Sequence, residues 1–205
     1  MNPRTQRRLI DGPAGPLQCA IDEPDSGSPQ GLALLCHPHP QFGGTMDNKV
    51  VQTLARSLVQ LGWRVARFNF RGVGESGGQW AGGAGEIDDA WAVLQALREP
   101  GQALALGGFS FGGFVATWVA QRLADPASLK HLVLVSPAVV NFKSATVGAQ
   151  TVLIQGELDD VVPLSAVLEW ARPQALPVTV IPGAGHFFHG QLGLLKQVIL
   201  KHCGN

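Results

Sequence analysis

The sequence is poor in charge. Only 15% of its 205 residues are charged, and fifteen basic side chains balance fifteen acidic ones. A chain without net charge offers no electrostatic basis for binding nucleic acid or an anionic membrane. The 45% hydrophobic content also argues against a disordered chain and predicts a single compact domain over residues 1–205.

Cysteines and long apolar runs are scarce as well. Cys19, Cys36 and Cys203 are odd in number and widely separated, which argues against a disulfide framework or a zinc site. No apolar run approaches the length of a membrane span, so no membrane segment is expected. The cytoplasm is therefore the expected compartment.

What the sequence does contain is an alternation of short apolar runs with amphipathic segments. Strands are predicted at Leu17–Ile21, Leu32–Cys36, Arg64–Phe70, Ala103–Gly107, Leu132–Val135, Val152–Gln155 and Val178–Ile181. Helices are predicted at Asn48–Leu61, Glu86–Arg98, Gly112–Leu123, Ser165–Ala171 and Gln191–His202. This order predicts an α/β fold with a mostly parallel, doubly wound sheet of about seven strands and helices on both faces. The first strand is expected to be an antiparallel edge, because no helix separates it from the second.

Two serines match the pattern G-x-S-x-G, and their sequence surroundings decide which one is the candidate nucleophile. Ser110 lies in G-F-S-F-G, and Ser76 lies in G-E-S-G-G. Ser110 follows a predicted strand and precedes a predicted helix, a junction that exposes the side chain at the end of the strand, where such sheets bind ligands. Ser76 is followed by the glycine-rich stretch G-G-Q-W-A-G-G-A-G, which predicts a loop. Ser110 is therefore the predicted nucleophile and Ser76 a loop serine.

The strand, G-x-S-x-G and helix around Ser110 resemble the nucleophile elbow of the α/β-hydrolases. The likeness extends along the chain. R-F-N-F-R-G-V-G-E-S at Arg67–Ser76 is similar to a loop common in that family, and H-P-H-P-Q-F-G-G-T-M-D-N-K at His37–Lys49 is similar to its oxyanion loop. The resemblance implies a small bacterial serine hydrolase that acts by acyl transfer, without a metal or cofactor.

A serine nucleophile needs a base, and His186 is the leading candidate. It lies in the loop between the last predicted strand and the last predicted helix, and it resembles the histidine of the family's triad. His189, three residues further on, is the alternative.

The base in turn needs an acid, and L-I-Q-G-E-L-D-D-V-V-P supplies three acidic residues after a strand. The family pattern G-x-x-D-x-x-x-P selects Asp159, with Asp160 and Glu157 as the alternatives. The resulting order of nucleophile, acid and base is that of the α/β-hydrolases.

The oxyanion formed during acyl transfer needs backbone N–H donors. The resemblance assigns one to Phe111, the residue after the nucleophile. The other comes from the loop after Cys36, where Pro38 and Pro40 have no N–H. His39 is the preferred donor and Gln41 the alternative.

The stretch between Val135 and Thr151 is too short for a lid domain, which predicts an open site. Its expected substrate-binding walls are Phe42, Asn141, Phe142 and Phe187. The expected partner is a small-molecule carboxylic ester, although a thioester or an amide would use the same groups. A non-catalytic binding protein on the same fold is the alternative function, and the oligomeric state is not predicted.

Overall fold

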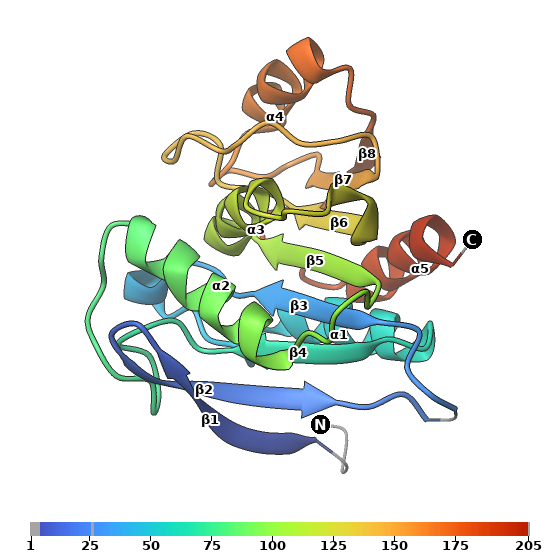
Figure 1. Ribbon diagram of the computed structural model, residues 1–205. Helices are drawn as coiled ribbons and strands as arrows, with labels where there is room; N and C mark the ends of the chain where they lie inside the picture. Colours follow the sequence, from blue (N-terminus) through green and yellow to red (C-terminus); the bar gives the residue numbers. More distant parts are fainter. Residues whose placement is uncertain (1–4, 26, 205) are drawn as a thin grey trace.

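The computed structural model describes residues 5–25 and 27–204, and its centre is a single twisted sheet (Figure 1). The sheet has eight strands in the order β1-β2-β4-β3-β5-β6-β7-β8. The strands are β1 (Gln6–Gly12), β2 (Gly15–Asp22), β3 (Leu32–Cys36), β4 (Arg64–Phe68), β5 (Leu104–Phe109), β6 (Leu129–Val135), β7 (Thr151–Gly156) and β8 (Val178–Ile181).

The predicted parallel α/β architecture is confirmed. Strands β3 to β8 pair in parallel, whereas β2 pairs with β4 in the antiparallel sense. Every residue of β3 and β5 is buried, as expected for continuous apolar strands that are covered on both faces.

The prediction of about seven strands, with the first at the edge, was wrong in one respect. An unpredicted strand, β1, forms an antiparallel hairpin with β2 and takes the edge position. Of the residues of β1, only Ile10 is buried. The segment therefore lacks the apolar run from which a strand could have been predicted. Arg7 lies on this strand and pairs with Asp47 at 3.3 Å.

Within the described residues, five α-helices cover the two faces of the sheet: α1 (Lys49–Gln60), α2 (Ala84–Leu97), α3 (Phe111–Gln121), α4 (Leu164–Ala171) and α5 (Leu192–Cys203). Helices α2, α3 and α4 share one apolar cluster with the sheet, and α1 and α5 share another on the opposite face. Figure 1 shows α2 and α3 in front of the sheet, with α1 and α5 behind it.

No lid domain covers the strand ends. The segment between Val135 and Thr151 contains no helix or strand, in agreement with the expectation from its length. Among the described residues, no helix is long and apolar enough to span a bilayer.

Candidate active site

Ser110 lies at the junction between β5 and α3, where the chain turns sharply. Its φ of 56° and ψ of −118° are unfavourable for a residue with a side chain. Hydrogen bonds hold this backbone in place, because Ser110 N–H donates to Val135 O at 3.0 Å and Ser110 O accepts from Gly113 and Ala138. The hydroxyl caps no backbone N–H of α3, which leaves its oxygen free of the helix.

Two glycines make this turn possible. A Cβ on Gly112 would lie 2.1 Å from Cys36 O, and a Cβ on Gly108 would lie 2.2 Å from Gly112 C. No side chain fits at either position, because both contacts are with backbone atoms that cannot move aside. The same close approach brings the end of β3 against the first turn of α3, beside Ser110.

The structure brings His186 and Asp159 together. His186 Nδ1 lies 2.8 Å from Asp159 Oδ2 and 3.0 Å from Oδ1, and both side chains are buried. Asp159 follows β7 and His186 follows β8, so they meet at the strand ends where Ser110 follows β5. The His186 ring also packs against Phe109, the residue before Ser110, with 4.8 Å between the ring centroids.

Several donors hold the Asp159 carboxylate in addition to His186. Val161 and Val162 donate their backbone N–H groups at 3.0 Å and 2.8 Å, and Gln155 Nε2 donates at 3.0 Å. Burial alone would raise the pKa of Asp159, but the hydrogen bonds from His186 and Val162 outweigh it and hold this pKa below its usual value. Asp159 is therefore a carboxylate that can orient an imidazole and balance its positive charge.

The alternative acid and base candidates lie elsewhere. Asp160 and Glu157 are exposed, and Glu157 accepts a hydrogen bond from Gly183 N–H at 2.8 Å. His189 is exposed, and its ring contacts that of Phe187. The structure therefore pairs Asp159, and neither of its acidic neighbours, with His186.

The loop after β3 contains two histidines with different surroundings. His37 is fully buried: its Nδ1 lies 2.6 Å from Pro38 O, and its Nε2 accepts from Phe70 N–H at 3.1 Å. Burial lowers the pKa of His37 to about 3, so the ring is neutral and serves as a brace between two loops. His39 is half-buried, and its Nδ1 accepts from Gln41 N–H at 3.2 Å. Within the described part of the chain, no three His, Cys, Asp or Glu side chains form a cluster that could hold a metal ion.

The four predicted substrate-binding residues form two groups, one near Phe111 on one side and one near Phe109 on the other, the two sequence neighbours of Ser110. Phe142 packs against Phe111 with 5.0 Å between centroids, and Phe42 packs against His39 at 4.7 Å. On the other side, the half-exposed Phe187 contacts Phe109 and His186. Asn141 is exposed beside Phe142.

The sequence interpretation missed Trp80. This half-buried residue contacts the His39 ring at 4.5 Å and the Phe111 ring at 5.2 Å. Its glycine-rich surroundings predicted only a loop, and a tryptophan within that loop was the one available signal.

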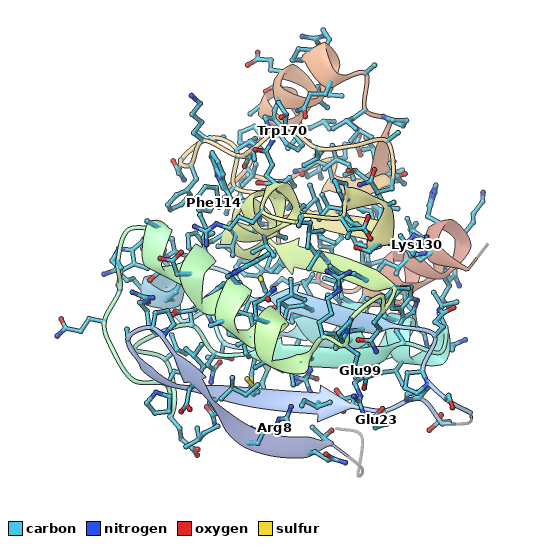
Figure 2. The ribbon with its side chains drawn as sticks, in the orientation of Figure 1. Arg8, Glu23, Glu99, Phe114, Lys130 and Trp170 are labelled. Carbon is cyan, nitrogen blue, oxygen red and sulfur yellow. The ribbon has the colours of Figure 1, made fainter. Side chains whose placement is uncertain are left out.

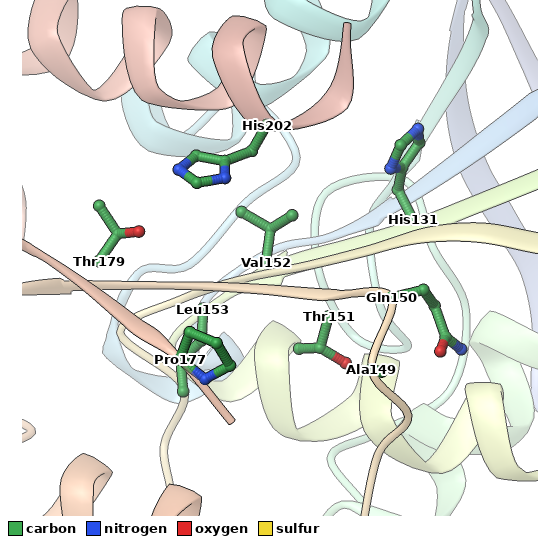
Figure 3. A pocket seen from close by; sticks show the side chains of 9 residues that line it. All are labelled: His131, Ala149, Gln150, Thr151, Val152, Leu153, Pro177, Thr179 and His202. Atoms are coloured by element: carbon green, nitrogen blue, oxygen red, sulfur yellow. The ribbon is translucent and has the colours of Figure 1, made fainter. Parts of the chain in front are cut away.

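Two described cavities lie away from these residues. One, of about 330 Å³, is bounded by the first residues of β6, β7 and β8, at the sheet edge opposite Ser110. Figure 3 shows His131 and His202 in it, on either side of Val152. The other, of about 430 Å³, lies between the end of α3 and the segment before β7. Neither cavity is lined by a predicted site residue.

Comparisons with known proteins identify the family and agree with the fold. Residues 27–177 match the model of the family described as serine aminopeptidase, S33. An uncharacterized protein of Rickettsia prowazekii is 33% identical over 173 residues, which cover 77% of this chain and 71% of that protein.

Two solved structures are similar over nearly the whole chain. An α/β serine hydrolase homologue from Coxiella burnetii is 39% identical, with a TM-score of 0.88 and 96% of each chain covered. The protein XC6422 from Xanthomonas campestris, described as an α/β serine hydrolase without lid, is 36% identical, with a TM-score of 0.87 and coverage of 98% of this chain and 94% of that one. The chain therefore belongs to the serine aminopeptidase S33 family of the α/β-hydrolase superfamily.

Proposed function

We propose that this chain is a serine hydrolase that cleaves carboxylic esters by acyl transfer, with Ser110 as nucleophile, His186 as base and Asp159 as acid. The observation that carries this proposal is the buried hydrogen bond of 2.8 Å between His186 and Asp159, at the sheet edge where Ser110 occupies a strained turn. Strained backbone beside a buried imidazole–carboxylate pair is typical of a site that performs chemistry.

The hydrogen bonding of His186 assigns its two ring nitrogens different roles. Its Nδ1–H donates to Asp159, which leaves Nε2 without a proton and able to accept one. As Ser110 Oγ bonds to the ester carbonyl carbon, its proton passes to Nε2. The Asp159 carboxylate stabilises the resulting imidazolium and keeps the ring in the productive orientation.

Two backbone N–H groups are suited to the oxyanion that forms. Phe111 is the first residue of α3, so its N–H has no partner within the helix and lies at the positive end of the helix dipole. The second donor is His39 N–H. The alternative, Gln41 N–H, already donates to the His39 side chain. One such donor typically contributes a factor of about 10² to 10³ in turnover.

The second half of the reaction returns the enzyme to its starting state. The tetrahedral intermediate collapses, the imidazolium gives its proton to the leaving alkoxide, and Ser110 keeps the acyl group as an ester. Water then loses a proton to His186 as its oxygen attacks the acyl carbon, and Ser110 Oγ leaves with that proton. A thioester or an amide would use the same groups.

An active-site probe combined with a substrate panel tests this proposal. A fluorophosphonate should label the protein stoichiometrically, and hydrolysis of ester, thioester and amide analogues of one acyl group should be fastest for the ester. Absence of both labelling and hydrolysis would favour the alternative, a binding protein that uses the hydrolase fold without its chemistry.

A further inference from the structure

Four aromatic rings form a patch on the oxyanion side of Ser110, here called the aromatic patch: His39, Phe42, Trp80 and Phe142. The His39 ring is its centre, with centroids 4.5 Å from Trp80, 4.7 Å from Phe42 and 5.8 Å from Phe142. The patch rests on the buried Phe111 ring, which contacts Trp80 and Phe142 at 5.2 Å and 5.0 Å. The patch therefore lies beside Phe111, the residue that follows Ser110.

The patch is an exposed surface above a buried aromatic floor. Phe111 and Phe114 lie beneath it and are buried, whereas 85% of the Phe42 surface is exposed. His39, Trp80 and Phe142 are half-buried. Large aromatic side chains left accessible beside a reactive group are typical of a ligand site, because folding alone would bury them more fully.

The loop that carries Trp80 is held by a buried charge. Glu86, at the start of α2, is fully buried and accepts from Ala81 N–H at 2.9 Å and from Gly83 N–H at 2.7 Å. Gly83 itself lies so close to Phe114 that a Cβ would come within 3.0 Å of its ring. Burying a carboxylate is costly unless its hydrogen bonds are satisfied, and here they fix the backbone directly after Trp80. The backbone next to Trp80 is therefore held in place, and the indole itself packs against the His39 and Phe111 rings.

Two polar hydrogens of the patch are free for a ligand. No described residue accepts a hydrogen bond from the Trp80 indole N–H, whereas the Trp118 indole donates to Lys143 O. In His39, Nδ1 accepts from Gln41 N–H, so the proton of the neutral ring is on Nε2, which also has no acceptor among the described residues. Burial lowers the pKa of His39 against the opposing effect of Glu86, which favours this neutral form. A planar ring with an oxygen substituent would match both the aromatic faces and the donors.

We propose that the aromatic patch binds an aryl group of the substrate, so that this enzyme prefers aryl-bearing esters to alicyclic ones of the same size. Trp80 is its specificity-determining residue. This inference rests on the proposed function, since it assigns a substrate class to the same site. The aryl group can belong to the acyl part or to the alcohol part of the ester, and the experiment distinguishes the two.

Matched substrates isolate the contribution of the ring. Methyl phenylacetate and methyl cyclohexylacetate test the acyl part, and benzyl acetate and cyclohexylmethyl acetate test the alcohol part. Neither pair conjugates the ring with the reacting carbonyl or changes the leaving group much. In at least one pair, kcat/KM should favour the aryl ester by roughly two- to tenfold, the range expected for aromatic contacts beyond area burial.

The Trp80→Leu variant should lower the ratio of kcat/KM for the aryl ester to that for the alicyclic ester to about one, mainly through a higher KM for the aryl ester, whereas Trp80→Phe should retain the wild-type ratio. Trp170→Leu is the matched control: Figure 2 shows Trp170 near the end of α4, and the described ring contacts of the patch residues do not include it. No aryl preference in either pair, or an equal loss for both esters in Trp80→Leu, would overturn the proposal.

A binding measurement separates this proposal from the proposed function. Two ligand pairs, phenylacetate with cyclohexylacetate and benzyl alcohol with cyclohexylmethanol, are titrated into the Ser110→Ala protein, and saturation-transfer NMR reports contact with the ring protons. Selective binding of the aryl member of either pair that is lost in Ser110→Ala/Trp80→Leu supports the aryl site even if no ester is hydrolysed. Hydrolysis of esters combined with no selective binding would refute the aryl site alone.

Discussion

Ser76 and Ser110 share the same local pattern and nearly the same burial, with 8% and 7% of their surfaces exposed, but the fold uses their hydroxyl groups differently. Ser76 Oγ accepts from Gln18 N–H at 3.0 Å and donates to Asn69 O at 2.7 Å, so it joins a loop to β2. Ser110 Oγ caps nothing in the helix that it begins. The same pattern thus contains one serine whose hydroxyl has a structural role and one whose hydroxyl does not cap the helix beside it, as the proposed nucleophile requires.

The glycines of the two patterns also have different roles. Gly74 and Gly78 have φ angles of 58° and 79°, which a turn requires and most other residues avoid. Gly112 is needed for space, since any side chain would collide with the backbone at Cys36. The same letters therefore encode a turn in one place and a strand–helix junction in the other.

The strongest test of this contrast is removal of each hydroxyl. Ser110→Ala should lower turnover by about 10⁴- to 10⁶-fold, because no other group can form the acyl intermediate. Ser76→Ala should retain turnover within a few-fold of wild type. Steady-state hydrolysis and fluorophosphonate labelling, followed by peptide mapping, measure both effects. Label found on Ser76, or normal turnover in Ser110→Ala, would reverse the assignment.

A second pair of variants compares the neighbouring carboxylates Asp159 and Asp160 in the same way. Asp159→Asn should lower kcat by about 10⁴-fold, because an amide in this position favours the wrong tautomer of His186. Asp160→Asn is the matched control and should stay within a few-fold of wild type, since Asp160 is exposed. Initial rates at saturating substrate measure both variants, and the opposite ranking would move the acid to Asp160.

The positions of Ser110, Asp159 and His186 could be predicted because each follows an apolar strand whose pattern is local. β1 could not be predicted, since most of its residues are polar and exposed, and it is held by pairing with β2 rather than by its own burial. The place of Trp80 depends on Glu86, a contact between a loop and a helix that no spacing in the sequence reveals. Local patterns predict buried elements well, whereas loops held by single buried polar groups need the structure.

His37 links the two serine regions, and its burial predicts a pH effect on stability. The folded protein keeps this ring neutral with a pKa of about 3, whereas the unfolded chain binds a proton near pH 6.5. Between these values the unfolded state holds the extra proton, so the free energy of unfolding should fall as pH drops. His37 should account for roughly 2 to 3 kcal/mol of the loss between pH 7 and pH 4.5.

Urea unfolding at the two pH values measures this effect. His37→Gln should be less stable than wild type at pH 7, because it lacks the imidazole that bonds to both Pro38 O and Phe70 N–H. On acidification the variant should lose less stability than wild type. An equal loss in wild type and variant would mean that other groups cause the acid sensitivity.

The smallest expected effect is on stability. Here the two serines should rank in the opposite order, with the larger effect at Ser76. Ser76→Ala leaves Gln18 N–H and Asn69 O without the partner that joins them, at a site where little of the residue is exposed. A buried polar group without a partner costs about 1 to 3 kcal/mol, so the free energy of unfolding should fall by that amount, measured as a lower urea midpoint with an unchanged slope. Ser110→Ala should leave the free energy of unfolding within about 0.5 kcal/mol of wild type, because its hydroxyl stabilises nothing in the helix. One variant should thus lose stability and keep turnover, while the other loses turnover and keeps stability. If Ser110→Ala proved as destabilised as Ser76→Ala, the Ser110 hydroxyl would have a structural role after all, and the contrast between the two serines would fail.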